Sequence, residues 1–411
     1  MRTIALGICI LVSLHVAAQR QCGTQSYLED QKSSNPHLAT KLAGIEYFIQ
    51  LQKENTRLNG EGTSRASGVI QVPVVVHVLY NTASQNISDA QIKTQIDALN
   101  RDFRRTNPDS MNTPERFRFL AADAEIEFKL ATADPGGRPT TGIIRKQTNV
   151  GYWQTDDKIK FNSQGGDDAW DSRYFLNIWV GNLQMVIGYS TSPGAPVEKN
   201  GVVIATSVFG TINTDAVYNK GRTAVHEIGH WLGLKHIWGD YYCGDDMVDD
   251  TPKQGNFTPG CPTSFRTSCD NASTGDMYMN YMDYTNDACL NLFTIGQKGR
   301  MRSLFYDGGP RASLLNSKGL AQPWVEEAPR EEPISLSRIY PNPATGTITL
   351  NLEKSWTGKM VYFINTNGVI VFSIKISSGT QTVNLSQLKP GMYILQAENE
   401  GGKWSERLIK L

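Results

Sequence analysis

The residues best suited to chemistry lie in one short segment that contains three of the six histidines of the chain. The segment reads His226-Glu227-Ile228-Gly229-His230-Trp231-Leu232-Gly233-Leu234-Lys235-His236. On a helix, His226 and His230 would project from the same face, within reach of one ion. Gly233 can adopt the left-handed backbone that ends a helix, so the chain can turn back and present His236 as a third ligand.

Three imidazoles that leave one coordination position open are typical of a catalytic zinc site rather than a closed structural one. The zinc ion would lower the pKa of a bound water and polarise a carbonyl. Glu227 would take the proton of that water and pass it to the leaving amine. Surface histidines on an amphipathic helix, or a metal site without activity, are the alternatives. Chance produces this pattern in such a chain with a frequency on the order of one in 10⁵, which favours the catalytic interpretation.

The N-terminal residues have the pattern of a secretory signal peptide. Arg2 precedes an apolar stretch, residues 4–16, and Ala17 and Ala18 are the small residues that signal peptidase reads. We expect residues 1–18 to be removed on export. A buried N-terminal helix is the alternative, and Gln21 before Cys22 argues against a lipid anchor. No later run of 18 apolar residues exists, so no transmembrane segment is expected in the mature chain.

Composition narrows the classes of function. The 40 basic and 40 acidic residues balance, so there is no basic field to hold a nucleic acid and no nucleic-acid partner is expected. A hydrophobic content of 39% is enough to fill cores, and 411 residues predict two or three folding units.

Cysteine usage fits an oxidising compartment. Cys9 would leave with the signal peptide, and Cys22 stands alone near the mature N-terminus. The other four cysteines can form two bridges in three possible pairings: Cys243, Cys261, Cys269 and Cys289.

The element pattern divides the rest of the chain into units. Residues 19–64 are polar, with a helical stretch at 38–52, and end in a Gly/Ser/Thr-rich piece that suits a cleavable linker. Residues 65–321 mix strands with two long helices and predict an α+β domain. Its strands are expected at 69–79, 125–130, 175–180 and 202–207, and its helices at 88–103 and 223–234.

A second domain follows a Pro/Glu-rich linker at 322–335. Residues 336–411 hold six short strands separated by turn residues, which predicts a small all-β sandwich. The strands are expected at 347–352, 360–364, 369–376, 381–385, 392–397 and 406–411.

An acidic cluster follows the histidine segment and suggests a calcium site, because Ca²⁺ prefers dense hard oxygen ligands. The alternative is a solvated acidic turn. The cluster consists of Asp245, Asp246, Asp249, Asp250 and Thr251.

The histidine segment matches the metzincin signature HExxHxxGxxH. With Asn280-Tyr281-Met282-Asp283-Tyr284 and Asp168-Ala169-Trp170, the chain resembles the pappalysin family of zinc endopeptidases over residues 69–305. The resemblance implies a metzincin fold, a twisted mixed sheet plus a zinc helix. It also implies that Met282 forms a hydrophobic floor under the metal and that Tyr284 stabilises the oxyanion.

Further features are implied by the same resemblance. We expect bridges Cys243–Cys269 and Cys261–Cys289, with metal ligation by these thiols as the rival. Structural calcium is expected at the acidic cluster, with Asp246, Asp249 and Thr251 as its ligands.

Latency is implied as well. Cys22 resembles a cysteine switch that binds zinc in the latent form, and removal of residues 19–64 at the Ser64-Arg65 bond would activate the enzyme. An exposed or intermolecularly paired Cys22 is the alternative. Relatives prefer Arg or Lys at P1′, which an acidic residue would explain, and Asp287 is the candidate by its position.

Residues 336–411 resemble a type IX secretion sorting domain. The resemblance rests on Tyr340-Pro341-Asn342-Pro343, on residues 388–394 and on the C-terminal Leu408-Ile409-Lys410-Leu411. It implies export across the outer membrane by that machinery, to the medium or the cell surface. A carbohydrate- or protein-binding sandwich is the alternative.

Together these features predict a secreted, zymogenic zinc endopeptidase that acts on proteins and peptides. A surface-associated binding protein with a relic metal site is the rival hypothesis.

Overall fold

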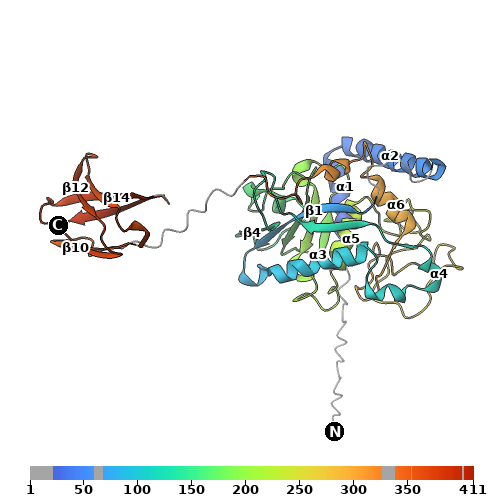
Figure 1. The fold of residues 1–411 in the computed structure, drawn as a ribbon. Coiled ribbons are helices and arrows are strands. Elements are labelled where there is room, and N and C mark those ends of the chain that lie inside the picture. The colour runs from blue at the N-terminus through green and yellow to red at the C-terminus, as the bar shows by residue number, and fades with distance from the viewer. Residues whose placement is uncertain (1–21, 60–67, 326–337, 353, 400–401) are drawn as a thin grey trace, which may run out of the picture. The chain divides into compact units, whose positions relative to one another are not determined.

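The computed structural model describes residues 22–59, 68–325, 338–352, 354–399 and 402–411 (Figure 1). The expected signal peptide 1–18 and the Ser64-Arg65 bond lie outside these residues. The chain forms two compact units, residues 1–326 and 327–411. Among the described residues, no helix is both long enough and apolar enough to cross a bilayer.

A six-stranded mixed sheet forms the centre of the first unit. Its order is β3-β1-β5-β7-β6, and β4 pairs with the second half of β1, beyond β3. All pairs are parallel except the edge pair of β6 with β7. β1 is almost wholly buried, as its β-branched sequence predicts for a strand covered on both faces. The strands are β1 (Ile70–Tyr80), β3 (Ile126–Leu130), β4 (Ile143–Gln147), β5 (Leu176–Gly181), β6 (Gly188–Ser190) and β7 (Gly201–Ala205).

Two helices contribute most of the helical residues of the main hydrophobic core, which also takes alternate residues from the central strands. These are α3 (Asp89–Phe103) and α5 (Arg222–Trp231). The side chain of Ser88 accepts a hydrogen bond from the amide of Gln91 and so caps α3, as the sequence predicts. Other strand residues, including Trp179 and Tyr189, belong to a second, aromatic cluster.

The N-terminal part of the described chain is helical. α1 (Thr24–Ser34) and α2 (His37–Asn59) precede the sheet, and α2 packs against α6 (Ile295–Ser303). Short elements complete the unit: α4 (Glu115–Arg118), β2 (Ala121–Ala122) paired with β8 (Phe293–Thr294), and 3₁₀ turns.

The second unit is all-β and contains two sheets, ordered β13-β10-β9 and β12-β11-β14-β15. One hydrophobic cluster draws residues from both sheets, including Leu350 and Phe363. The all-β character is therefore confirmed, and the sandwich arrangement stays a prediction. The strands are β9 (Arg338–Tyr340), β10 (Thr347–Asn351), β11 (Met360–Asn365), β12 (Ile370–Lys375), β13 (Thr380–Asn384), β14 (Gly391–Asn399) and β15 (Gly402–Lys410).

Two differences from the expected elements matter for function. The helix expected at 223–234 ends at Trp231, because Gly233 adopts a φ of +82° and turns the chain. Helix α1 has no counterpart among the expected elements, since its only buried residues are Thr24 and Tyr27 and so it lacks a continuous apolar face.

Candidate active site

Helix α5 places two imidazoles side by side. His226 and His230 lie one turn apart, and their Nε2 atoms are 3.1 Å from each other. After Gly233, the amide of Leu234 donates to the carbonyl of Gly229 at 2.9 Å, so the chain folds back across the helix end. This turn brings His236 Nε2 to 3.1 Å from His230 Nε2.

Each of these rings is oriented by a partner at its other nitrogen. Nδ1 of His226 lies 2.7 Å from the carbonyl oxygen of Tyr281, and Nδ1 of His230 lies 2.8 Å from that of Leu234. Nδ1 of His236 contacts the carboxylate of Asp240. Because carbonyl oxygens only accept hydrogen bonds, Nδ1 of His226 and of His230 carries the proton, and the Nε2 lone pairs point at one another.

This arrangement fits a tetrahedral metal ion. Lone pairs at this separation repel one another unless a cation lies between them, and zinc–nitrogen bonds of about 2.0–2.1 Å put neighbouring ligand atoms about 3.3 Å apart. Burial and the nearby His236 lower the pKa of His230 to about 3, so this ring is neutral, as a ligand must be.

Cys22 completes the set of ligand atoms. Its sulfur and one nitrogen from each of the three histidines all lie within 4.8 Å of one another. The segment that carries Cys22 pairs with the edge strand β6, because Cys22 forms a parallel bridge with Gly188, whose carbonyl accepts from the amide of Gly23 at 2.8 Å. The structure thus brings the expected latent-form ligand together with the three histidines.

Glu227 is 1% exposed and lies beside β6. A Cβ atom added to Gly188 would come within 2.9 Å of its side chain, so a larger residue at this strand position would displace the carboxylate. Oε2 of Glu227 accepts a 2.7 Å hydrogen bond from the hydroxyl of Thr24. That hydroxyl in turn accepts from the amide of Ser190 at 2.9 Å.

Met282 and Tyr284 lie close to the histidines. Met282 is fully buried beneath α5, where a Cβ atom on Gly229 would lie 2.5 Å from its sulfur. The ring of Tyr284 packs 4.9 Å from that of His236, and its hydroxyl lies 3.5 Å from the carbonyl oxygen of Cys22. Burial, with Cys22 and Glu227 nearby, raises the pKa of Tyr284, so its hydroxyl remains a hydrogen-bond donor at neutral pH.

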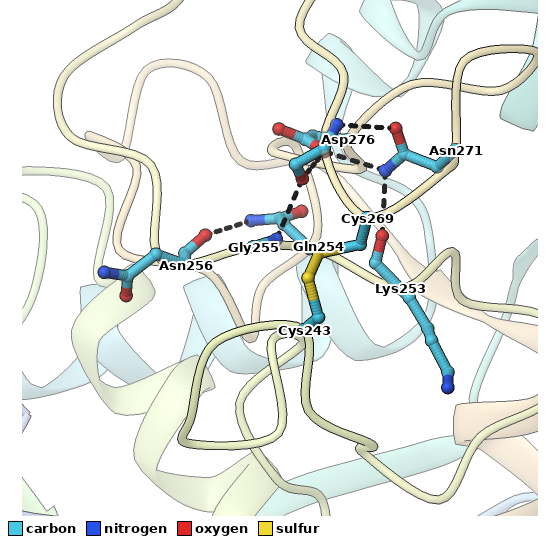
Figure 2. Close-up of a disulfide and its surroundings, with 9 residues drawn as sticks. Cys243, Lys253, Gln254, Gly255, Asn256, Cys269, Asn271 and Asp276 are labelled. Carbon is cyan, nitrogen blue, oxygen red and sulfur yellow. Dashed lines mark hydrogen bonds between the residues drawn. A yellow bond between two sulfur atoms is a disulfide. The ribbon is translucent and has the colours of Figure 1, made fainter.

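Two disulfides brace the long loop after His236. The structure joins Cys243 to Cys269 and Cys261 to Cys289, the pairs that the family resemblance implies. Figure 2 shows the first bridge within a polar network, in which the side-chain amide of Asn271 donates to the carbonyl of Lys253 and to Asp276. The loop is therefore held by covalent and polar links in addition to its own hydrophobic cluster, which includes Trp238, Met277 and Met279.

The residues of the expected calcium site are only partly brought together. Asp246 is 5% exposed and accepts from the hydroxyl of Thr251 at 2.9 Å. Burial raises its pKa to about 7 despite the hydrogen bonds from Thr251 and the amide of Val248. Asp249 instead forms a 2.5 Å ion pair with Lys53 of α2. Calcium at this loop stays a prediction.

Asp287 lies buried at the N-terminus of α5. Its Oδ2 accepts from the amides of Lys220 and Arg222 at 2.9 and 3.2 Å. The carboxylate therefore caps the helix that carries His226, and its expected role in selecting basic side chains stays a prediction.

Two residues of the site escape sequence reasoning. Thr24, which reaches Glu227 across 203 positions of sequence, carries no local signal. The sequence gives a partial signal for Asp240, because ligating histidines often hydrogen-bond to a carboxylate and Asp240 follows the third histidine by four residues. Its backbone adopts a φ of +69°, a conformation that the sequence around it does not predict.

Comparisons with known proteins identify relatives of this chain. The family described as Pregnancy-associated plasma protein-A matches residues 160–305, and the Secretion system C-terminal sorting domain matches residues 338–411. An extracellular metalloprotease of Colletotrichum graminicola is 30% identical over 296 residues, which cover 70% of this chain and 90% of that protein. One of Verticillium alfalfae is 32% identical over 61% of this chain and 84% of its own length.

Solved structures are also similar to this chain. A mutant of Tannerella forsythia promirolysin is 45% identical, with a TM-score of 0.66 over 72% of this chain and 97% of that one. Mature Tannerella forsythia mirolysin with a cleaved peptide is 51% identical, with a TM-score of 0.59 over 61% of this chain and 96% of that one.

Proposed function

Because the chain belongs to the pappalysin family of metzincin metalloproteases and carries a sorting domain for export to the cell surface or the medium, we propose that it is a zymogenic zinc endopeptidase. The observation that carries the proposal is the convergence of three imidazole Nε2 atoms and the Cys22 sulfur beside a buried glutamate. His226, His230 and His236 would hold the ion. When bound, the zinc ion acts as a Lewis acid and lowers the pKa of water at the site.

The protein groups then divide the proton transfers and the charge stabilisation. Glu227 accepts a proton from the attacking water and delivers it to the amine that leaves. Its position next to His226 and its burial keep the carboxylate close to the reacting atoms. The hydroxyl of Tyr284 donates to the oxygen on which negative charge develops, and Met282 supports the histidines from below.

In the latent form, we propose that the N-terminal segment blocks both halves of this machinery. The Cys22 sulfur occupies the ligand position that water needs. The hydroxyl of Thr24 donates a hydrogen bond to the carboxylate of Glu227 and so takes the place of the attacking water there. Activation requires removal of residues 19–64, which leaves the catalytic domain 65–321, the linker 322–335 and the sorting domain 336–411. The type IX secretion machinery would recognise the last of these.

Substrate choice rests on charge. We propose that the negative charge of Asp287 favours an arginine or lysine at P1′. We also propose that Asp246 and Thr251 hold a structural calcium ion, with Asp249 joining them once the Lys53 segment has gone. The substrates proposed for the enzyme are proteins and peptides.

Hydrolysis of azocasein by the processed protein tests the proposal. The Glu227→Ala variant should lose activity by a factor of about 10² or more, in the range of general acid–base catalysis, while it keeps its metal content. Glu198→Ala, a change at an exposed glutamate, is the matched control and should retain full activity. Unchanged hydrolysis by Glu227→Ala, or no hydrolysis by processed and zinc-loaded protein, would refute the proposed function.

A further inference from the structure

Tyr27 of α1 is inserted into the catalytic domain at a position that latency by Cys22 does not require. Its side chain is 3% exposed. It belongs to the aromatic cluster that includes Trp153, Ile159 and Tyr189, and is the only member of that cluster from the described part of the N-terminal segment. The ring centroids of Tyr27 and Tyr189 lie 5.1 Å apart.

The floor of this pocket is polar. The Tyr27 hydroxyl donates to Asp157, whose two carboxylate oxygens lie 2.9 and 3.0 Å away. Asp157 also forms ion pairs with Lys160 at 2.8 Å and with Lys199 at 3.2 Å. Both Asp157 and Lys160 are almost fully buried, so the charges are held in a low-dielectric site where hydrogen bonds to them are strong.

Lys160 adds a second element of recognition. Its ammonium group lies 5.1 Å from the centroid of the Tyr27 ring and 5.0 Å from that of Tyr189, within the range of cation–π attraction. A carboxylate acceptor, an aromatic wall and a cation near the ring together select a phenol. Phenylalanine would lose the bond to the carboxylate, and an aliphatic side chain would lose the ring contacts as well.

The pocket is connected to the catalytic site through β6. This strand is the edge of the sheet, and the Cys22 segment already pairs with it. Successive residues of a strand face opposite sides: Gly188 faces Glu227, whereas Tyr189 faces the Tyr27 pocket. An extended peptide that adds to this edge would direct alternate side chains to the two sides.

We propose that in the processed enzyme this pocket is a substrate subsite for a tyrosine side chain, reached by a peptide that lies along the outer edge of β6. Its lining residues all belong to the catalytic domain, so removal of residues 19–64 exposes the pocket without dismantling it. This inference rests on the proposed function, because it assumes that the segment leaves and that peptides occupy its place.

A binding experiment tests the pocket without catalysis. A synthetic peptide of residues 23–34 lacks Cys22 and cannot ligate a metal. We expect it to bind the processed enzyme and to bind about tenfold more weakly after Tyr27→Phe, the effect of losing a hydrogen bond to a charged group. Asp30→Asn, a change at an exposed position of the peptide, should not alter binding. Equal affinity of the parent peptide and the Tyr27→Phe peptide, or no binding at millimolar concentration, would overturn the proposal.

Hydrolysis then tests the substrate role. Tyrosine is moved through the positions on either side of the scissile bond in a peptide that the enzyme already cleaves, with phenylalanine at the same positions for comparison. At one position kcat/KM should be about tenfold higher for tyrosine. Asp157→Asn should bring the tyrosine-to-phenylalanine ratio close to one, and Asp156→Asn should preserve it.

The outcomes separate the two proposals. If no peptide is cleaved, the proposed endopeptidase function fails. If the reference peptide is cleaved but tyrosine gives no advantage at any position, the subsite proposal alone fails, and the pocket serves only to anchor the N-terminal segment.

Discussion

The hydroxyl of Thr24 donates a 2.7 Å hydrogen bond to the carboxylate of Glu227. Two residues earlier, the Cys22 sulfur lies with the three histidines. The same short segment thus contacts the metal ligands and the general base at once. A thiol that merely approached the histidines would leave Glu227 available to a water molecule, whereas this segment engages both partners that hydrolysis needs.

The first prediction concerns the hydrogen bond between Thr24 and Glu227. Thr24→Val keeps the shape of the side chain but removes the hydroxyl that donates to Glu227 and accepts from Ser190. Loss of a hydrogen bond to a charged group costs about 1.5–3 kcal/mol, so the unprocessed Thr24→Val protein should open about 10- to 150-fold more often. The initial rate on a fluorogenic peptide, measured before any processing is visible on a gel, should rise accordingly. Thr24→Ser should remain latent, and a Thr24→Val protein as silent as the parent would contradict the role.

The second prediction concerns the carboxylate behind the third histidine. Asp240 contacts Nδ1 of His236 and should fix the orientation of that ring. Asp240→Ala should lower zinc affinity by about 10–100-fold, the usual effect of losing such a partner. Competition with a chromophoric chelator measures this, and Asp245→Ala, a change at an exposed acid in the same loop, serves as the control. Equal zinc affinity in all three proteins would show that Asp240 does not position the ring.

The third prediction concerns pH and the docking of α2. Although burial raises the pKa of Glu46, hydrogen bonds and charge from Arg300 lower it to about 2. The pair joins α2 to α6, with Arg300 6% exposed at its side chain. A depressed carboxyl pKa stabilises the docked state above the ordinary value of 4.5, and this contribution fades as pH falls from there towards 2.

The protection of the α2 amides against hydrogen exchange should therefore be nearly independent of pH between about pH 5 and 8 and should fall below about pH 4. In Glu46→Gln the amides should be less protected at neutral pH, and the acid-dependent step attributed to this pair should be absent. An unchanged acid transition in Glu46→Gln would assign it to other groups.

The fourth prediction concerns calcium. With zinc held constant, addition of calcium to EGTA-treated protein should raise the melting temperature by several degrees, because a ligand that binds only the folded state stabilises it by mass action. Asp246→Ala should abolish the shift. The control Asp270→Ala, an exposed aspartate in the same disulfide-linked loop, should leave it intact. The absence of any calcium-dependent shift in the parent protein would refute the site.

Much of the scaffold is predictable from local patterns. The β-branched run of β1 and the capped, amphipathic α3 can be located in the sequence, because their periodicity and end signals agree with their final burial. The histidine spacing likewise predicts that His226 and His230 share a helix face, and Gly233 predicts the turn that returns His236. These features depend on contacts within a few turns of the chain.

The remaining parts of the site depend on contacts that no local pattern encodes. Thr24 and Tyr27 lie on a polar helix without a continuous apolar face, and their partners Glu227 and Asp157 stand far away in sequence. The burial of Lys160 in an aromatic cluster runs against the usual exposure of lysine. Only the folded structure shows that Asp157 and the rings around Lys160 compensate for this burial.

Anomalous diffraction at the zinc edge, from crystals of the unprocessed chain, tests the central claim most directly. One peak is predicted about 2.0–2.1 Å from Nε2 of His226, His230 and His236 and about 2.3 Å from the Cys22 sulfur. A map without a peak among these atoms in zinc-loaded protein, or a peak held by other residues, would contradict the account.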